Sequence, residues 1–416
     1  MYLTDQEKKM LSGEYGAPVQ KAMEILVHLG EFYGAEKMVA VRNVHMPGSS
    51  SIVAGKAGIR FVESMGNEGG VFCTLTTLNT AAVDLLNWQD LGFPEQYYHD
   101  QARLTRAYKK MGGVGCHTCI PYLSGNLPRF GEHIAWGESS AIAFVNSVVG
   151  ARTNREGGPS ALAAALTGRV PLYGYHLDEN RAGQVKVNVT AELKGAFDYG
   201  TLGYYVGKQC QELIPVFTGL PSGATIDELK MLSAALASSG SVALFHVVGI
   251  TPEAPTLAAA FRGKAALMEI EFGRTEYEET VAQLNKSQTN RVDLVVIGCP
   301  HASIDEIKLV AENLYENKIN SAVDFWITTT IGNKEIANRN GYLEMIEKAG
   351  ARLVCDTCPI LGPTAALIGT KGYNAIATNS AKLAHYIPGQ WNIGSHYGSL
   401  EQCIKAAITG EWGDER

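Results

Sequence analysis

The sequence predicts an α/β protein with more than one parallel sheet flanked by helices. In the last third of the chain, continuous apolar runs alternate with helical segments, which is typical of a parallel sheet buried on both faces. The four apolar runs are 293–297, 322–327, 352–354 and 375–377. A length of 416 residues and a hydrophobic content of 46% allow two or three domains with sizeable cores.

The first half of the chain mixes helix and strand signals. A capping-box pattern, Thr4 with Glu7, begins a helix, and apolar residues at helical spacing follow behind Pro18. Short apolar runs then predict strands at 38–41, 58–62 and 71–75. Helices are expected at 132–149 and 160–167.

The middle of the chain, residues 191–240, is predicted to be mostly helical, with a break at 219–223. A strand is expected at 241–248, and the two prolines of 249–255 mark a rigid connection after it. We therefore predict three domains: an N-terminal α/β catalytic domain (1–215), a middle α/β segment (216–290) and a C-terminal α/β domain (291–416) that carries Cys299 and Cys358.

Charge and composition exclude several classes of protein. A formal net charge of −7 argues against partners such as nucleic acid or an anionic membrane surface. No apolar run approaches the roughly 20 residues that span a bilayer, and the N-terminus turns polar directly after Leu3. We expect a cytoplasmic protein whose eight cysteines are free thiols, metal ligands or catalytic groups rather than disulfides.

Chemically reactive residues follow the apolar runs of the last third. Ligands bind outside the carboxyl ends of the strands in open α/β sheets. Just past the expected strand ends lie Cys299, the threonines 328–330, the pair Cys355 and Cys358, and Lys382 with Ser380. A turn or packing role explains any one of them, but four in series indicate a functional site.

The loop cysteines admit more than one metal site. Cys116/Cys119 and Cys355/Cys358 are C-x-x-C pairs, a pattern of tetrahedral zinc sites, but they lie far apart in the sequence and leave Cys299 unexplained. The alternative takes one cysteine from each of three loops, which would hold an iron–sulfur cluster with one iron open to substrate. Unligated thiols are the third interpretation.

The segment 146–160 carries Arg152 and Arg155 ahead of two glycines, a proline and an expected helix start. Guanidinium groups near a helix N-terminus suit a carboxylate or phosphate, although a solvated loop explains the segment equally well. We predict an anion-binding role for both arginines. The chain lacks a Walker lysine motif and a G-x-G-x-x-G sequence after a strand, so ATP and NAD have no support.

Longer motifs carry a resemblance to a known family. The runs 119–140 and 150–160, together with 249–255, 298–301, 356–358 and 378–382, resemble aconitase X, a divergent branch of the aconitase superfamily. The resemblance covers essentially the whole chain and implies an aconitase-like multidomain hydro-lyase. It also implies that Cys119, Cys299 and Cys358 hold a [4Fe-4S] cluster, a [2Fe-2S] cluster or a single iron. Cys116 and Cys355 are additional to this three-cysteine set, and whether either is a fourth ligand stays open.

The same resemblance implies the other site residues. The expected substrate contacts are Gly48, Ser49, Ser50 and Asn79, to which the anion argument adds Arg152 and Arg155. The expected catalytic residues are Glu138, Ser139 and Lys382. Glu138 is expected to protonate the leaving hydroxyl group, with a structural pairing to Arg or Lys as the alternative.

The expected reaction removes water from a small hydroxy acid. Where the mevalonate-5-phosphate dehydratase branch reads Gly-Val-Ser and Asn-Pro, this chain has Gly48-Ser49-Ser50 and Asn79-Thr80. We therefore expect a cis-3-hydroxy-L-proline-like substrate, with the mevalonate-5-phosphate dehydratase large subunit as the alternative. Two other classes stay open: a noncatalytic zinc-binding interaction subunit, and an isomerase that rehydrates its product.

A partner is also implied by the resemblance. The superfamily carries a small swivelling domain with a catalytic serine, either fused to the large part or separate. The α/β pattern continues almost to Trp412 and leaves no segment for it. We expect a large subunit that lacks the swivelling domain and is inactive until a separate small subunit closes the cleft over the small-molecule substrate.

Overall fold

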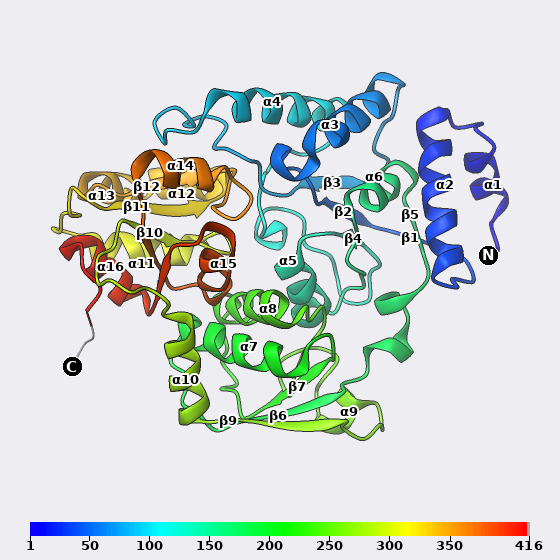
Figure 1. The fold of residues 1–416 in the computed structure, drawn as a ribbon. Coiled ribbons are helices and arrows are strands. Elements are labelled where there is room, and N and C mark those ends of the chain that lie inside the picture. Colours follow the sequence, from blue (N-terminus) through cyan, green and yellow to red (C-terminus); the bar gives the residue numbers. More distant parts are fainter. Residues whose placement is uncertain (414–416) are drawn as a thin grey trace.

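The computed structural model describes residues 1–413 and arranges them as three α/β units around separate sheets (Figure 1). The first unit contains a three-stranded parallel sheet in the order β3-β2-β4 and an antiparallel pair, β1 with β5. Its strands are β1 (Met38–Ala40), β2 (Asn43–Met46), β3 (Leu75–Leu78), β4 (Ala135–Trp136) and β5 (Arg169–Pro171). Its α-helices are α1 (Asp5–Leu11), α2 (Ala17–Phe32), α3 (Ser51–Asn67), α4 (Glu95–Lys110), α5 (Ser139–Phe144) and α6 (Gly158–Thr167).

The second unit is a four-stranded parallel sheet in the order β8-β7-β6-β9. Its strands are β6 (Val185–Val189), β7 (Pro215–Thr218), β8 (His246–Val247) and β9 (Met268–Phe272). Its helices are α7 (Ala196–Cys210), α8 (Ile226–Gly240), α9 (Leu257–Phe261) and α10 (Arg274–Leu284). Helix α8 packs against α5 of the first unit, so the units meet at the centre of the molecule (Figure 1).

The third unit is a five-stranded parallel sheet in the order β12-β11-β10-β13-β14. Its strands are β10 (Leu294–Ile297), β11 (Asp324–Thr329), β12 (Arg352–Cys355), β13 (Ala375–Thr378) and β14 (Gly394–Tyr397). Its helices are α11 (Ile304–Leu314), α12 (Ile331–Arg339), α13 (Tyr342–Ala349), α14 (Thr364–Lys371), α15 (Ala381–Trp391) and α16 (Leu400–Thr409). The strand order reverses between β10 and β13, and such a switch point opens a crevice at the carboxyl ends of the strands.

The predicted fold class is confirmed. Strand β10 shows why the strands in the last third of the chain could be predicted from the sequence. Val295 and Ile297 face one core while Leu294 and Val296 face another, so both faces of the strand are buried and the apolar run is continuous. Short connections complete the chain as 3-10 turns at Pro121–Leu123, Gly174–His176 and Asp178–Arg181 and a π-helical turn at Val145–Val149.

Several predicted elements of the first two units are wrong. The run 58–62 belongs to α3, where Ile59, Val62 and Met65 are buried at helical spacing. The strand expected at 241–248 is reduced to β8, because Asn146 and Ser147 side chains bond the backbone before it: Asn146 Nδ2 donates to the Ala243 carbonyl at 3.0 Å, and Ser147 Oγ accepts from Phe245 N–H at 2.8 Å.

Other elements were shifted or missed. The helix expected at 132–149 begins only at Ser139, because β4 pairs with β2 before it. Strand β7 lies inside the segment 191–240 that was predicted to be mostly helical. The domain boundaries expected at residues 215 and 290 stay predictions; the four-stranded sheet combines β6 with strands on the other side of residue 215. Within residues 1–413, no helix has the length and apolarity that crossing a membrane requires.

Candidate active site

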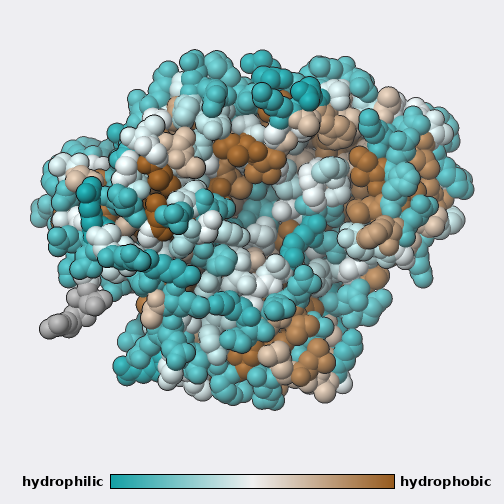
Figure 2. Space-filling view, in the orientation of Figure 1, coloured by the Kyte–Doolittle hydropathy of each residue, from teal (hydrophilic) through white to brown (hydrophobic). Residues whose placement is uncertain are grey.

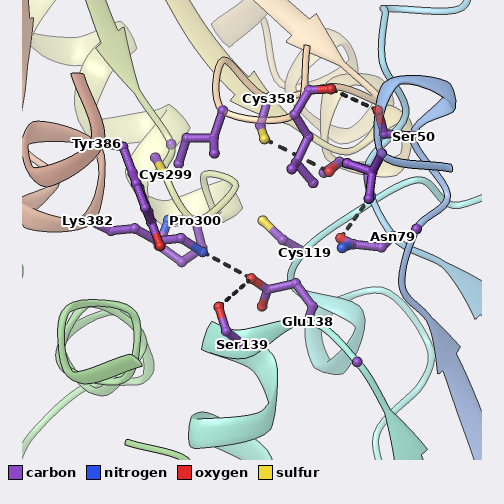
Figure 3. Close-up of a pocket in the computed structure, with 17 residues that line it drawn as sticks. Ser50, Asn79, Cys119, Glu138, Ser139, Cys299, Pro300, Cys358, Lys382 and Tyr386 are labelled. Carbon is purple, nitrogen blue, oxygen red and sulfur yellow. Dashed lines mark hydrogen bonds and ion pairs between the residues drawn. The ribbon is translucent and has the colours of Figure 1, made fainter. Parts of the chain in front are cut away.

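A cavity of about 260 Å³ lies between the first and third units (Figure 3). Its walls are the loops that follow β2, β3 and β4 on one side and β10, β12 and β13 on the other. The carboxyl ends of two parallel sheets therefore face one another across it, with the switch point between β10 and β13 on its wall. The lining residues are Gly48, Ser50, Val53, Asn79, Thr80, Cys119, Gly137, Glu138, Ser139, Gly298, Cys299, Pro300, Cys358, Ile360, Leu361, Lys382 and Tyr386.

Nine of the predicted site residues line this cavity: Gly48, Ser50, Asn79, Cys119, Glu138, Ser139, Cys299, Cys358 and Lys382. Ser49 lies behind the wall, where its hydroxyl donates to the Met46 carbonyl at 2.9 Å. Ser50 Oγ donates to the Leu361 carbonyl at 2.8 Å, which joins the loop after β2 to the loop that carries Cys358.

Three thiols, those of Cys119, Cys299 and Cys358, line the cavity from three separate loops (Figure 3). All three side chains are buried, and burial raises the pKa of each thiol, to about 12 for Cys299. The Lys382 ammonium opposes that rise at each of them. Burial therefore disfavours the thiolate form of all three cysteines, and positive charge beside them favours it.

Glu138 and Lys382 form a buried ion pair on the same wall, with Lys382 Nζ 3.0 Å from Glu138 Oε1 (Figure 3). Glu138 also caps α5, where its Oε2 accepts from Ala141 N–H at 2.6 Å, and Lys382 Nζ donates to Ser140 Oγ at 2.6 Å. Burial alone would raise the pKa of Glu138, but Lys382 and the Ala141 N–H outweigh it and the pKa falls.

The pKa of Lys382, the other member of the pair, shifts in the opposite direction. Burial would lower the pKa of Lys382, but Glu138 and the thiols of Cys299 and Cys119 outweigh it and the pKa is raised. Both groups are therefore charged at neutral pH. The structure shows the pairing with a lysine that the sequence offered as the alternative, and the expectation that Glu138 protonates the leaving hydroxyl group stays a prediction.

Comparison with known proteins agrees with this architecture. Family profiles described as the first, second and third domains of aconitase X match residues 1–179, 183–282 and 292–409. The chain belongs to the aconitase X family. A crystal structure of Thermococcus kodakaraensis aconitase X in its holo form superposes with a TM-score of 0.87 at 39% sequence identity, covering 98% of this chain and 100% of that one.

Two groups of named relatives are similar to this aconitase X chain. The phosphomevalonate dehydratase large subunit of Methanothermobacter thermautotrophicus is 43% identical over 97% of this chain and 98% of its own length. The cis-3-hydroxy-L-proline dehydratase of Pseudomonas aeruginosa is 37% identical over 97% of this chain and 69% of its own length. Both are dehydratases, so the chain is an enzyme of the hydro-lyase class, and a noncatalytic zinc-binding role is not supported.

The two C-x-x-C pairs of this aconitase X chain do not converge. Neither Cys116 nor Cys355 lines the cavity; Cys116 Sγ lies 3.7 Å from the Leu78 carbonyl, and Cys355 ends β12 in the core. In the part of the chain that the structure describes, no group of three or more His, Cys, Asp or Glu side chains is arranged to hold a single metal ion. The structure therefore does not bring the two pairs together as a four-thiol site, and neither Cys116 nor Cys355 lines the cavity beside the other three cysteines.

The two arginines predicted to bind an anion lie outside the cavity. Arg152 Nη2 donates to Asp178 at 2.6 Å and its Nη1 to the His176 carbonyl at 3.2 Å, while Arg155 is exposed. The Arg152 guanidinium therefore forms an ion pair with Asp178 outside the cavity. Neither arginine lines the cavity, and the expectation that both contact the substrate stays a prediction.

Tyr386 is a cavity residue that sequence reasoning missed. It lies one turn after Lys382 on α15, so helical spacing places both side chains on the same face. That spacing was the available signal. The apolar lining residues Val53, Ile360 and Leu361 had no comparable signal, because nothing distinguishes them in the sequence from core residues.

The buried side-chain amide of Gln101 links two cavity loops of the first unit, those that follow β2 and β3. Gln101 of α4 accepts through Oε1 from Ser51 N–H at 2.9 Å and from Ala82 N–H at 2.8 Å. Its Nε2 donates to the Ser49 carbonyl at 2.8 Å. The loop that carries Ser50 and the loop that carries Asn79 are therefore held by one side chain.

Gly298 positions Cys299, and its replacement by alanine is expected to destabilise the protein. Gly298 has a φ of +94°, and a Cβ there would overlap the Thr328 carbonyl oxygen of the neighbouring strand. We expect Gly298→Ala to lower the free energy of unfolding by at least about 2 kcal/mol, measured by urea titration. Gly341→Ala is the control, because Gly341 has a φ of +78° with no atom within 4 Å of the added Cβ. Equal losses for both variants would contradict the overlap argument.

Proposed function

We propose that this chain is the large subunit of a dehydratase that acts on a small zwitterionic hydroxy amino acid of the cis-3-hydroxy-L-proline type. The charge balance of the cavity carries the proposal. Of the lining residues in the described part of the chain, Lys382 bears the fixed positive charge and Glu138 the negative charge, 3.0 Å apart. A substrate with one carboxylate and one ammonium group complements that pair, since each substrate charge meets its opposite.

A phosphorylated hydroxy acid is the second candidate, and a different observation favours it. The phosphomevalonate dehydratase large subunit of Methanocaldococcus jannaschii is 42% identical to this chain, above the 37% of the Pseudomonas aeruginosa proline dehydratase. Such a substrate carries a carboxylate and a phosphate without a compensating cation. Binding both in a buried cavity would require several cationic groups, and Arg152 and Arg155 do not line it.

The three thiols fit an iron–sulfur cluster. They line one cavity from three separate loops, and burial raises the pKa of each thiol, so a cation bound beside them would favour the thiolate form. A cluster joins several irons through sulfide and so spans a wider set of thiolates than one ion does. Cys119, Cys299 and Cys358 would hold it, and when bound it supplies a Lewis acid that weakens the substrate C–O bond. A single iron is the other candidate occupant.

The residues around the thiols bind and orient the substrate. Lys382 binds the substrate carboxylate, and Glu138 accepts a hydrogen bond from the substrate ammonium, so the elimination begins from one orientation. The Asn79 side chain, which would contact the substrate, is fixed by a hydrogen bond in which its Oδ1 accepts from Thr80 N–H at 2.8 Å. The helix cap at Ala141 and the hydroxyl of Ser140 keep the two charged groups in place before substrate arrives.

A separate small subunit supplies the remaining base and closes the cavity. Several relatives are named large subunits, which supports a two-part enzyme. The start of α3 offers apolar contacts at the mouth: Val53, which lines the cavity, is 56% exposed, and its neighbour Ile52 is 43% exposed. Figure 2 shows an apolar patch over the start of α3, beside the hollow of this face.

Turnover of both substrate types by the anaerobically purified complex of this chain with its small subunit tests the proposal. We expect kcat/KM for cis-3-hydroxy-L-proline to exceed that for mevalonate 5-phosphate by at least about 100-fold, because a buried site leaves an unmatched charge unpaired. The reverse preference would establish the second candidate. Turnover of neither compound would refute both substrate assignments.

A further inference from the structure

His301 contacts the loops of all three cavity cysteines. It lies two residues after Cys299, and its side chain is fully buried. Its ring bonds Thr118 Oγ1 through Nδ1 at 3.1 Å and the Thr357 carbonyl through Nε2 at 2.9 Å. We propose that His301 is a positioning residue that fixes the spacing of Cys119, Cys299 and Cys358, an inference that rests on the proposed metal-binding role of those thiols.

The hydrogen-bond partners determine the tautomer of the ring. The Thr357 carbonyl can only accept, so Nε2 carries the proton. Nδ1 then accepts the hydroxyl proton of Thr118, whose oxygen in turn accepts from Ile120 N–H at 3.1 Å. Both ring nitrogens are satisfied, and the ring acts as a fixed spacer between the two threonines rather than as a proton donor to substrate.

Each partner of the ring is the immediate neighbour of a cysteine. Thr118 precedes Cys119 in the first unit, and Thr357 precedes Cys358 in the third unit, at the end of a different strand from Cys299. Without the imidazole, these loops have fewer direct ties to each other. A cluster binds well only when its thiolates are held at fixed separations, so a rigid link between the loops favours retention of the metal.

The backbone of His301 adds two further ties. Its N–H donates to Cys119 Sγ at 3.2 Å, and its carbonyl accepts from Lys230 Nζ at 3.3 Å. Lys230 lies on α8 of the second unit and is itself fixed by Asp227 at 2.9 Å and by Glu306. His301 therefore joins all three units, and the backbone ties persist when the side chain is replaced.

Substitutions of the ring and of its partner test the inference. We expect His301→Ala to release iron to a chelator at least about 10-fold faster than the wild type, measured anaerobically in the complex with the small subunit. Thr118→Val removes the Nδ1 partner with little change in volume and should also accelerate release. His301→Gln, whose amide offers a donor and an acceptor, should restore part of the retention.

The matched control is His246→Ala in β8. His246 is also buried, and its Nε2 donates to the Arg181 carbonyl at 2.8 Å, away from the cavity. A comparable fall in melting temperature for both alanine variants, with faster iron release only for the His301 variant, would support positioning. Iron release at the wild-type rate in both His301→Ala and Thr118→Val would overturn it.

Thiol labelling of the metal-free protein separates this inference from the proposed function. Maleimide labelling followed by mass spectrometry should be faster at Cys119 and Cys358 in His301→Ala than in the wild type, with buried Cys403 unchanged as internal reference. A wild-type protein that holds no iron refutes the proposed function alone, and labelling still tests the loops. Unchanged labelling of both cysteines refutes the positioning role.

Discussion

Cys299→Ser is expected to abolish dehydration, with a loss in kcat/KM of at least about 10⁴-fold and a loss of most bound iron. Cys299 is one of three cysteines whose thiols line the cavity from separate loops, and serine is a poor ligand for iron in place of a thiolate. Iron and acid-labile sulfide per chain, determined beside activity after anaerobic purification with the small subunit, provide the measurement.

Cys116→Ser is the matched control for that loss. Cys116 belongs to the same C-x-x-C motif as Cys119 but does not line the cavity. It should keep the wild-type iron content and most of the activity. Equal losses of iron in Cys116→Ser and Cys299→Ser would contradict the assignment of the three cavity thiols as the ligand set.

Lys382→Met is expected to lower kcat/KM by about 10³-fold and to destabilise the protein by about 3–5 kcal/mol. In the proposed binding mode the activity falls because the substrate carboxylate loses its cation. The stability falls because the buried Glu138 carboxylate loses its partner at 3.0 Å. Steady-state kinetics and urea titration measure the two effects separately.

A double substitution distinguishes the two causes. Adding Glu138→Gln to Lys382→Met removes the unpaired charge and should recover much of the stability, because a neutral amide costs far less to bury than a lone carboxylate. The activity should stay low, since the double variant still lacks the lysine ammonium that binds the substrate carboxylate. Recovery of activity in the double variant would show that Lys382 acts only by neutralising Glu138.

Much of the cavity was predictable because parallel sheets place their functional residues in one location. Cys299 and Lys382 follow β10 and β13, the two strands that flank the reversal of strand order. Continuous apolar runs in the sequence predict both strands. The family motifs then added Glu138 and Asn79 from the other sheet. That the two sheets face each other is a property of packing between units, which no local pattern encodes.

The misses have physical causes of the same kind. The segment around Arg152 has the residue types of an anion site. The orientation of the Arg152 side chain, however, is set by its hydrogen bond to Asp178, which lies in a later turn. The extended segment before β8 is apolar like a strand, yet its backbone bonds to side chains of Asn146 and Ser147. His301 stands in a recognised motif, but the hydrogen bonds behind its proposed positioning role are made to Thr118 and Thr357, which are remote in sequence.

Iron and acid-labile sulfide per chain, determined with a visible spectrum on the anaerobically purified complex, is the most direct measurement of the central claim. A cluster held by Cys119, Cys299 and Cys358 predicts iron and sulfide together, with a spectrum that disappears in Cys299→Ser. Iron without sulfide would contradict the cluster and leave a mononuclear Lewis acid. Zinc alone, unaffected by loss of Cys299, would contradict the three-thiol centre itself.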